Sequence, residues 1–286
     1  MLRYAADRAA VVVVLGASAV FVGQWWLVGH PGPLTALAVL LALPVASLAH
    51  NHNHLPISRS RALNVVLDYW FTCAYGLPKL SWAEIHNRVH HVHGNRPGLD
   101  VTSTHGAGDR ADLLGLLVYV PVCFPGFLGV HGRALARAWR EDRRQLAWHA
   151  SHLVLLYGLL ALALAVAWKK ALLFIVLPQQ AGITAITVFN YCQHVRTDHG
   201  SRTNLARNFL SPILNRYLFN AGYHTIHHLK PTLHWSLAPA GQARVASEID
   251  PRLCERSFWG WFVREIVAGP FLRRARGRRA VAEAGP

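Results

Sequence analysis

Four long stretches of this chain are almost wholly apolar, and they leave few folds open to it. Each approaches the roughly 20 residues that an α-helix needs to cross about 30 Å of hydrocarbon. Only 15% of the 286 residues are charged, whereas 52% are hydrophobic, a balance that suits a membrane protein. The stretches are residues 9–28, 34–49, 151–168 and 171–189. They predict an all-α membrane protein with about four transmembrane helices in two hairpins, at about 9–49 and 151–189.

The first apolar stretch also allows a cleavable signal peptide, because Arg3 and Arg8 precede it. It is long for a signal peptide, however, and a His-Pro-Gly-Pro turn at 30–33 leads directly into the next apolar stretch. We therefore expect both helices in the mature protein. The second stretch is short, and we expect the polar residues after it to extend its helix.

The basic residues predict the orientation in the membrane. If the N-terminus is cytoplasmic, all but two of the 29 Lys and Arg residues lie on the cytoplasmic side, the exceptions being Lys169 and Lys170. This favours a multi-pass protein of the inner or plasma membrane. We treat residues 1–286 as one domain, with cytoplasmic regions at about 50–112 and 190–257 and a basic tail at about 273–286.

The apolar segment 113–130 contains Pro121, Pro125 and three glycines, which argue against a straight spanning helix. Its two ends should lie on the same side of the membrane, so it must cross an even number of times. We expect a re-entrant or interfacial element here.

The net charge of +15 raises the question of nucleic-acid binding. The basic residues are spread over the predicted cytoplasmic loops, as the positive-inside rule and attraction to anionic lipid predict, so we do not expect it. Some of these charges are instead available to an acidic protein partner. The four cysteines show no C-x-x-C spacing, and we expect them to be small buried side chains. They are Cys73, Cys123, Cys192 and Cys254.

Thirteen of the eighteen histidines lie in four short clusters, a spacing of imidazoles typical of a metal centre. The clusters are His50, His52 and His54; His86, His90, His91 and His93; His194 and His199; and His224, His227, His228 and His234. With the predicted topology, all four lie at helix exits or in cytoplasmic segments and should converge. We expect the other five at the surface or the membrane interface; they are His30, His105, His131, His149 and His152.

Helical geometry separates candidate ligands from their neighbours. His50 and His54 are four residues apart and share a face, whereas His52 points about 200° away and belongs beside the site or at the surface. In the second cluster an ideal α-helix favours His86, His90 and His93, since His91 lies about 140° round from His86.

Four motifs occur in a specific order: H-x-x-x-H at 50–54, H-x-x-x-H-H at 86–91, N-x-x-x-H at 190–194 and H-x-x-H-H at 224–228. In this order they resemble the integral-membrane fatty acid desaturase and hydroxylase superfamily. The flanks H-N-R-V-H-H-V-H-G-N, followed by Asp100, and N-A-G-Y-H-T-I-H-H-L-K-P-T-L-H-W at 220–235 look like those of acyl desaturases. The resemblance spans roughly residues 45–240.

The resemblance implies a cytoplasmic helical cap that holds two non-haem iron ions and uses O2 as co-substrate. Zinc, in contrast, usually stops at four ligands. The resemblance favours His91 over His93, and it implies Asn190 as a weak or water-mediated ligand. The nine implied histidine ligands are His50, His54, His86, His90, His91, His194, His224, His227 and His228. Residues expected to support them are Glu84, His93, Asp100, Asp198 and His234.

The implied reaction is desaturation of a fatty acyl lipid, whether free or linked to CoA, a carrier protein or a glycerolipid. Two departures leave hydroxylation as an alternative: Leu99-Asp100-Val101 stands where the family commonly has an Asp-Pro-Asp type sequence, and the box at 86–91 is one residue longer than in desaturases. This longer box and the N-Y-C-Q-H box at 190–194 resemble alkane hydroxylases. The flanks match over more residues and favour desaturation. A histidine-rich metal transporter is a third hypothesis, but its ligands should lie near the membrane midplane.

Electrons must reach such a site from outside the chain. There is no G-x-G-x-x-G motif after a strand and no cysteine cluster, so no flavin, haem or iron–sulfur segment is recognisable. The resemblance implies a separate donor such as a ferredoxin, a rubredoxin or cytochrome b5. An acidic donor would suit the basic cytoplasmic face.

Overall fold

Six long helices form the frame of the protein in a computed structural model that describes residues 1–271. They are α1 (Arg8–Leu27), α2 (Pro33–His54), α3 (Arg61–Tyr75), α6 (Leu113–Glu141), α7 (Arg143–Ala171) and α8 (Leu177–His194). Short helices fill the first two thirds of the chain: η1 (Ala5–Asp7), α4 (Lys79–Ala83), η2 (Glu84–His90), α5 (His91–His93), η3 (Thr104–Ala107) and η4 (Leu172–Val176).

The C-terminal third consists of short elements, and the two strands β1 (Asn208–Phe209) and β2 (Cys254–Glu255) pair in parallel. The helices are α9 (Pro212–Tyr217), α10 (His224–Leu229), η5 (Trp235–Leu237), α11 (Ala238–Val245), η6 (Ala246–Glu248), η7 (Pro251–Leu253), α12 (Phe258–Trp261) and η8 (Phe262–Val267). The arginine-rich end of the predicted basic tail, from Arg273 to Arg279, lies outside the described residues.

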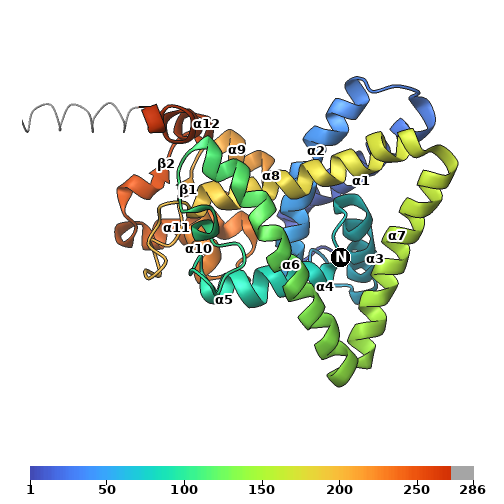
Figure 1. Cartoon of the computed structure of the whole chain (residues 1–286), viewed down its shortest axis with the longest axis horizontal. Coiled ribbons are helices and arrows are strands. Elements are labelled where there is room, and N and C mark those ends of the chain that lie inside the picture. The colour runs from blue at the N-terminus through green and yellow to red at the C-terminus, as the bar shows by residue number, and fades with distance from the viewer. Residues whose placement is uncertain (272–286) are drawn as a thin grey trace, which may run out of the picture.

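Within residues 1–271, four helical stretches are long and apolar enough to cross a membrane: Ala5–Leu27, Pro33–His54, Leu113–Glu141 and Arg143–His194. The second of them confirms that polar residues extend the helix beyond residue 49, because α2 continues to His54. The last combines α7, η4 and α8. The chain bends at Ala167, where φ is −156° and ψ is 76°, so a kink joins the third and fourth predicted helices (Figure 1).

The segment 113–130 does not form the re-entrant element that was one of the two expectations, because α6 runs without interruption to Glu141. Pro121 and Pro125 are four residues apart, so they lie on one face of α6, and both are exposed there. Gly126 lies on another side, where a Cβ atom would come within 2.8 Å of Val101. An interfacial position of α6 stays a prediction, and exposed apolar side chains such as Leu117 and Phe124 suit it.

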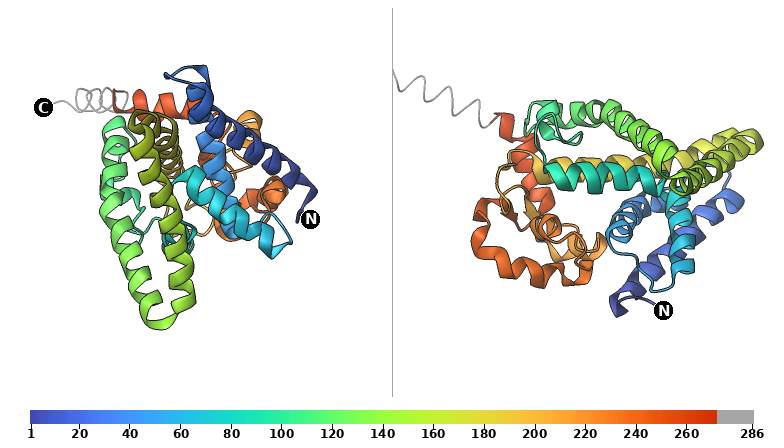
Figure 2. Two further views of the ribbon diagram at one scale, coloured as in Figure 1. Left: turned by 90° about the vertical axis from the view of Figure 1, so that its right-hand side faces the viewer. Right: turned by 90° about the horizontal axis from the view of Figure 1, so that it is seen from below.

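The helices are arranged so that the histidine-bearing segments gather at one end. α2 packs against both α1 and α8, and α6 and α7 form an antiparallel hairpin that Asp142 closes. The bend at Ala167 and the loop between α1 and α2 lie at one end of the molecule, and α9 to α12 lie at the other (Figures 1 and 2).

Two apolar cores hold this frame together. One joins α6, α8 and the C-terminal region through Tyr119, Phe189, Phe209 and Trp261. Full burial of each such side chain contributes roughly 1.5–3 kcal/mol. The other core joins α1, α2 and α3, where alanines let the helices approach closely. All four cysteines are free thiols; Cys123 and Cys192 are buried, and Cys73 and Cys254 are partly exposed.

Two histidines outside the clusters are not at the surface, contrary to expectation. His149 and His152 are each 1% exposed, because this face of α7 packs against α3 and α6. His152 Nδ1 lies 2.7 Å from the Thr72 hydroxyl, and the Tyr69 ring stacks on the imidazole. These side chains serve helix packing at this position.

Candidate metal centre

Nine histidine side chains converge in two groups at the end of α2 and α8. In each group one ring nitrogen from every residue lies within 4.8 Å of the others. The first group is His50, His54, His86, His91 and His227, and the second is His90, His194, His224 and His228. The groups adjoin, since the ring centroids of His91 and His228 are 4.6 Å apart. The structure thus brings together all nine histidines implied by the motifs.

The ring nitrogens of the first group point at one another. Nε2 of His50 lies 2.8 Å from Nε2 of His86 and 3.0 Å from Nε2 of His227, and Nε2 of His91 lies 3.0 and 2.9 Å from the same two atoms. Each of these nitrogens carries either one hydrogen or one lone pair, so at most two of the four contacts can be hydrogen bonds. A metal cation would instead accept a lone pair from all four nitrogens.

The second group has the same character. Nε2 of His194 lies 3.0 Å from Nε2 of His224, and Nε2 of His228 lies 3.2 Å from each. Nε2 of His90 is buried and has no hydrogen-bond partner in the described part of the chain. The donor set of both groups therefore fits a transition-metal ion, for which neutral imidazole is a suitable ligand.

A π-helix explains how the second cluster meets both groups. η2 has i→i+5 hydrogen bonds, so residues five apart lie nearly above one another. His86 and His91 therefore share a face, and His90 adjoins them. The α-helical spacing that favoured His93 does not apply to this wider turn, and His93 lies outside both groups.

The short helix α10 supplies histidines to both groups. His224 and His228 are four residues apart and point to the second group, whereas His227 lies on the adjacent line of the helix and points to the first. Thr225 and Ile226 are buried on the opposite side and fix the rotation of the helix. Thr225 donates from its backbone N–H to the Asn208 side chain.

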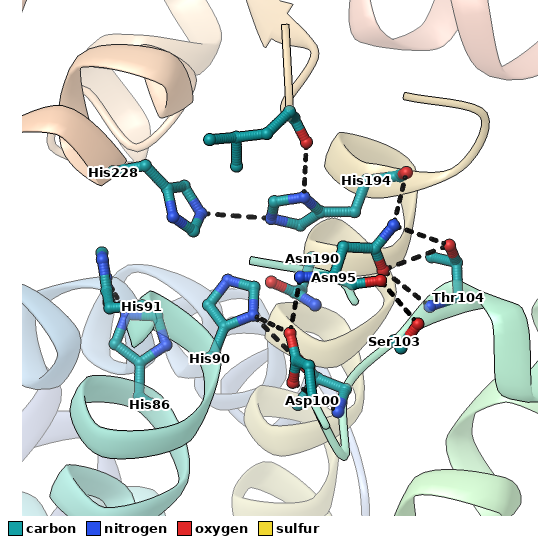
Figure 3. Close-up of polar contacts among 12 residues, drawn as sticks. His86, His90, His91, Asn95, Asp100, Ser103, Thr104, Asn190, His194 and His228 are labelled. Atoms are coloured by element: carbon teal, nitrogen blue, oxygen red, sulfur yellow. Dashed lines mark hydrogen bonds and ion pairs between the residues drawn. The ribbon is translucent and has the colours of Figure 1, made fainter. Parts of the chain in front are cut away.

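Asp100 holds the ring of His90 (Figure 3). The His90 Nδ1–H donates to the carboxylate at 2.8 Å, which leaves Nε2 as the free acceptor that faces the second group. The carboxylate also accepts from the backbone N–H groups of Asn95 and Thr102 and from the Thr102 hydroxyl. Burial alone would raise the pKa of Asp100, but His90 and these hydrogen bonds hold it well below its ordinary value.

The sequence indicated Asp100 as a supporting residue, but the motifs missed the residues around it. Asn95 donates to the carbonyl of His194 at 3.2 Å, and the Tyr119 hydroxyl donates to the carbonyl of Thr102 at 2.7 Å. The run N-R-P-G-L-D-V-T at 95–102 was the available signal, since it keeps a buried acid close behind the second histidine motif. The Nδ1–H of His194 donates to the carbonyl of Leu205 at 2.9 Å.

Asn190 lies beside histidines of both groups, since it lines the same cavity. Its amide donates to the Tyr119 hydroxyl at 2.9 Å, and the side chain lines a cavity beside His90 and His224. This places Asn190 one turn before His194 on α8.

The other residues expected to support the histidines have different partners. Glu84 pairs with Arg137 at 2.6 Å and with Arg88 at 3.5 Å. Asp198 is exposed and accepts from the backbone of a turn. Neither carboxylate contacts a grouped histidine among the interactions of the described residues.

Two further histidines form buried pairs with acids outside the groups. His234 donates to Asp7 at 3.0 Å, which ties the first turn of the chain to the last histidine cluster. His52 is 2% exposed and lies 3.1 Å from Asp68. His52 therefore lies beside the site and is paired there.

Burial makes the histidines of α10 suitable as ligands. It lowers the pKa of His224, His227 and His228 well below the ordinary value, and the neighbouring imidazoles lower it further. These rings are therefore neutral near pH 7, the form that coordinates a metal.

An apolar cavity of about 60 Å³ reaches both groups from the side of the long helices. His50 and His86 line it from the first group, and His90 and His224 from the second. The rest of the wall is mostly apolar and includes Ile85, Phe127, Ile186 and Phe189.

The family model for fatty acid desaturase matches residues 3–261 of the chain. This match includes all nine grouped histidines and all the long helices. The chain belongs to the fatty acid desaturase family. It is accordingly an oxidoreductase of the desaturase and hydroxylase type with a histidine-rich metal-binding site, and its apolar helices make it a membrane protein. None of the curated proteins matches the chain.

Proposed function

We propose that this protein is a membrane-bound di-iron, O2-dependent fatty acyl desaturase that introduces a carbon–carbon double bond. The observation that carries the proposal is the meeting of two histidine groups at one apolar cavity. Family membership supports a lipid substrate. A methylene chain in this cavity would lie beside both groups at once.

We propose that the nine grouped histidines hold two iron ions and that Asn190 is a weak or water-mediated ligand. The five histidines of the first group exceed the four ligands at which zinc usually stops. When bound, iron supplies the redox chemistry with O2 that hydrogen removal from an unactivated methylene requires.

The chain's own residues position the reactants. Asp100 keeps the proton of His90 on Nδ1, so that Nε2 stays available to the second group. Phe127, Ile186 and Phe189 exclude water and leave apolar contacts for the acyl chain. Overall, one O2, two electrons and two protons, with two hydrogens from the substrate, give the double bond and two waters.

The remaining features of the protein follow from this function. We propose a single desaturase-like domain in the inner or plasma membrane, with the metal centre facing the cytoplasm. The substrate is a fatty acyl lipid, free or linked to CoA, a carrier protein or a glycerolipid. A separate ferredoxin, rubredoxin or cytochrome b5 type protein supplies the electrons.

Hydroxylation is the second candidate, and the H-x-x-x-H-H box at 86–91 favours it. The same iron ligands would serve, but one oxygen atom of O2 would remain in the product. We place desaturation first because the acyl-desaturase-like flanks cover more of the chain.

Product analysis with labelled dioxygen tests the choice. The purified enzyme, reconstituted with an electron donor, should convert an acyl lipid to a product two mass units lighter and free of label. Heavy oxygen in the main product would establish hydroxylation instead. A preparation that carries zinc alone and shows no iron-dependent turnover would refute the di-iron proposal itself.

A further inference from the structure

A second pocket reaches the histidine groups through a different set of residues from those that line the apolar cavity. This pocket, the outer cleft, has a volume of about 210 Å³. Its lining includes His91, His93, Arg96, His199, Arg202 and His228. It shares no residue with the apolar cavity, so the metal centre has two separate approaches.

The two approaches differ in polarity. The outer cleft carries the guanidinium groups of Arg96 and Arg202, both exposed, and two further imidazoles, and none of its lining residues is acidic. These polar walls suit an acyl chain less well than the apolar cavity does. An anionic partner would be attracted electrostatically to each of the two guanidinium groups.

The outer cleft is lined by one histidine from each of the two groups. His91 comes from the first and His228 from the second, and their ring centroids are 4.6 Å apart (Figure 3). An electron that arrives there is therefore next to a histidine of each group. The other seven grouped histidines do not line the cleft.

The exposure of the outer cleft argues for a protein partner, since both of its arginines lie where another protein can reach them. Val92, which also lines the cleft, is 63% exposed and offers an apolar contact beside the two arginines. Apolar contact next to complementary charge is what a protein surface needs for specific docking.

We propose that the outer cleft is the docking site of an acidic one-electron carrier protein and that His91 and His228 are the point of electron entry. The proposal rests on the proposed function, which requires two external electrons per turnover. Two successive encounters with a reduced iron–sulfur or haem carrier supply them, and each leaves one oxidised carrier. The two protons of the overall reaction come from water.

Binding of an oxidised carrier tests the docking site without turnover. The purified enzyme in nanodiscs is titrated with an oxidised [2Fe–2S] ferredoxin, a rubredoxin and cytochrome b5 at low ionic strength. We expect at least one to bind and the charge reversals Arg96→Glu and Arg202→Glu each to raise its Kd about tenfold or more. The dependence of Kd on salt should also weaken in both variants.

The matched control is Arg144→Glu, the same charge change at an exposed arginine outside the cleft. Arg144 lies at the start of α7, at the tip of the α6–α7 hairpin, which projects away from α5 and α10 (Figures 1 and 2). The Kd of the Arg144→Glu variant for the carrier should stay within about twofold of the wild-type value. Equal effects in all three variants, or a wild type that binds none of the carriers, would overturn the proposal.

A chemical reductant separates docking from the reaction itself. After reduction with dithionite, single-turnover product formation in Arg96→Glu and Arg202→Glu should equal that of the wild type. If the variants instead require more acyl substrate, the arginines bind an anionic lipid headgroup and the docking proposal fails. If carriers bind as expected but the reduced wild type makes no product, the proposed function is wrong and the docking site stands.

Discussion

Replacing Asp100 by asparagine should weaken metal binding at one of the two histidine groups. Asp100 holds His90, which belongs only to the second group. The side chain of Asp100 is fully buried and accepts four hydrogen bonds, so no water can substitute for a lost partner. Asparagine has the same shape but carries an NH2 in place of one oxygen.

Each orientation of the new amide has a cost. If the amide NH2 of the asparagine faces His90, Nδ1 of His90 must accept the hydrogen bond and the imidazole proton must move to Nε2. A protonated Nε2 cannot coordinate a metal ion. With the NH2 toward Thr102, a buried backbone N–H loses its acceptor, at a cost of about 1–3 kcal/mol. We expect metal affinity at the second group to fall about 10–100-fold, or about 1.4–2.7 kcal/mol.

Iron content after dialysis against graded chelator measures this loss. Wild type should retain about two irons per chain at chelator concentrations where Asp100→Asn retains about one. Asp68→Asn is the control, since Asp68 is also a buried partner of a histidine, but His52 belongs to neither group. Equal retention by wild type and Asp100→Asn, or equal loss in both variants, would refute the role of Asp100.

Three further outcomes are expected. His227→Ala should abolish turnover and remove iron from the first group while the helical circular dichroism stays unchanged; a fully active variant would show that the site is misassigned. Because burial lowers the pKa of His224, His227 and His228, the metal-free folded chain binds fewer protons than the unfolded chain. The thermal stability of the metal-free protein should therefore fall as the pH drops below about 6.5. A thermal-unfolding midpoint that stays the same between pH 7.5 and 5 would contradict this expectation. Gly222→Ala places a Cβ against the Phe209 carbonyl and should destabilise the protein by roughly 1–3 kcal/mol, whereas Gly158→Ala, with nothing within 4 Å, should not; equal melting temperatures would argue against the tight contact.

The helical frame was largely predictable because apolar length is a direct signal. α2 extends to His54 as expected, since its last turn carries helix-compatible polar residues at the end of an apolar run. The continuity of α6 was not predictable in the same way. Prolines usually break a helix, and only the packing shows that Pro121 and Pro125 share an exposed face.

The histidines of the site were predictable as residues, but their arrangement was not. Spacing along an α-helix favoured His93, and only the π-helical turn of η2 aligns His86 with His91. The partner of Glu84 was equally invisible, because Arg137 lies more than fifty residues away in the chain. Long-range pairing of this kind depends on the tertiary fold, which local patterns do not encode.

The placement of α10 has a consequence for how the protein matures. This helix has six residues, too few to be stable alone, and yet both histidine groups are incomplete without it. His50 contacts His227, which is synthesised 177 residues later in the chain. Neither group can therefore bind a metal ion through all of its histidines until every long helix has been synthesised, and a bound ion would clamp the end of α2 to the C-terminal third. Assembly would finish at the metal centre, and a metal-depleted protein should expose α10 to proteases first.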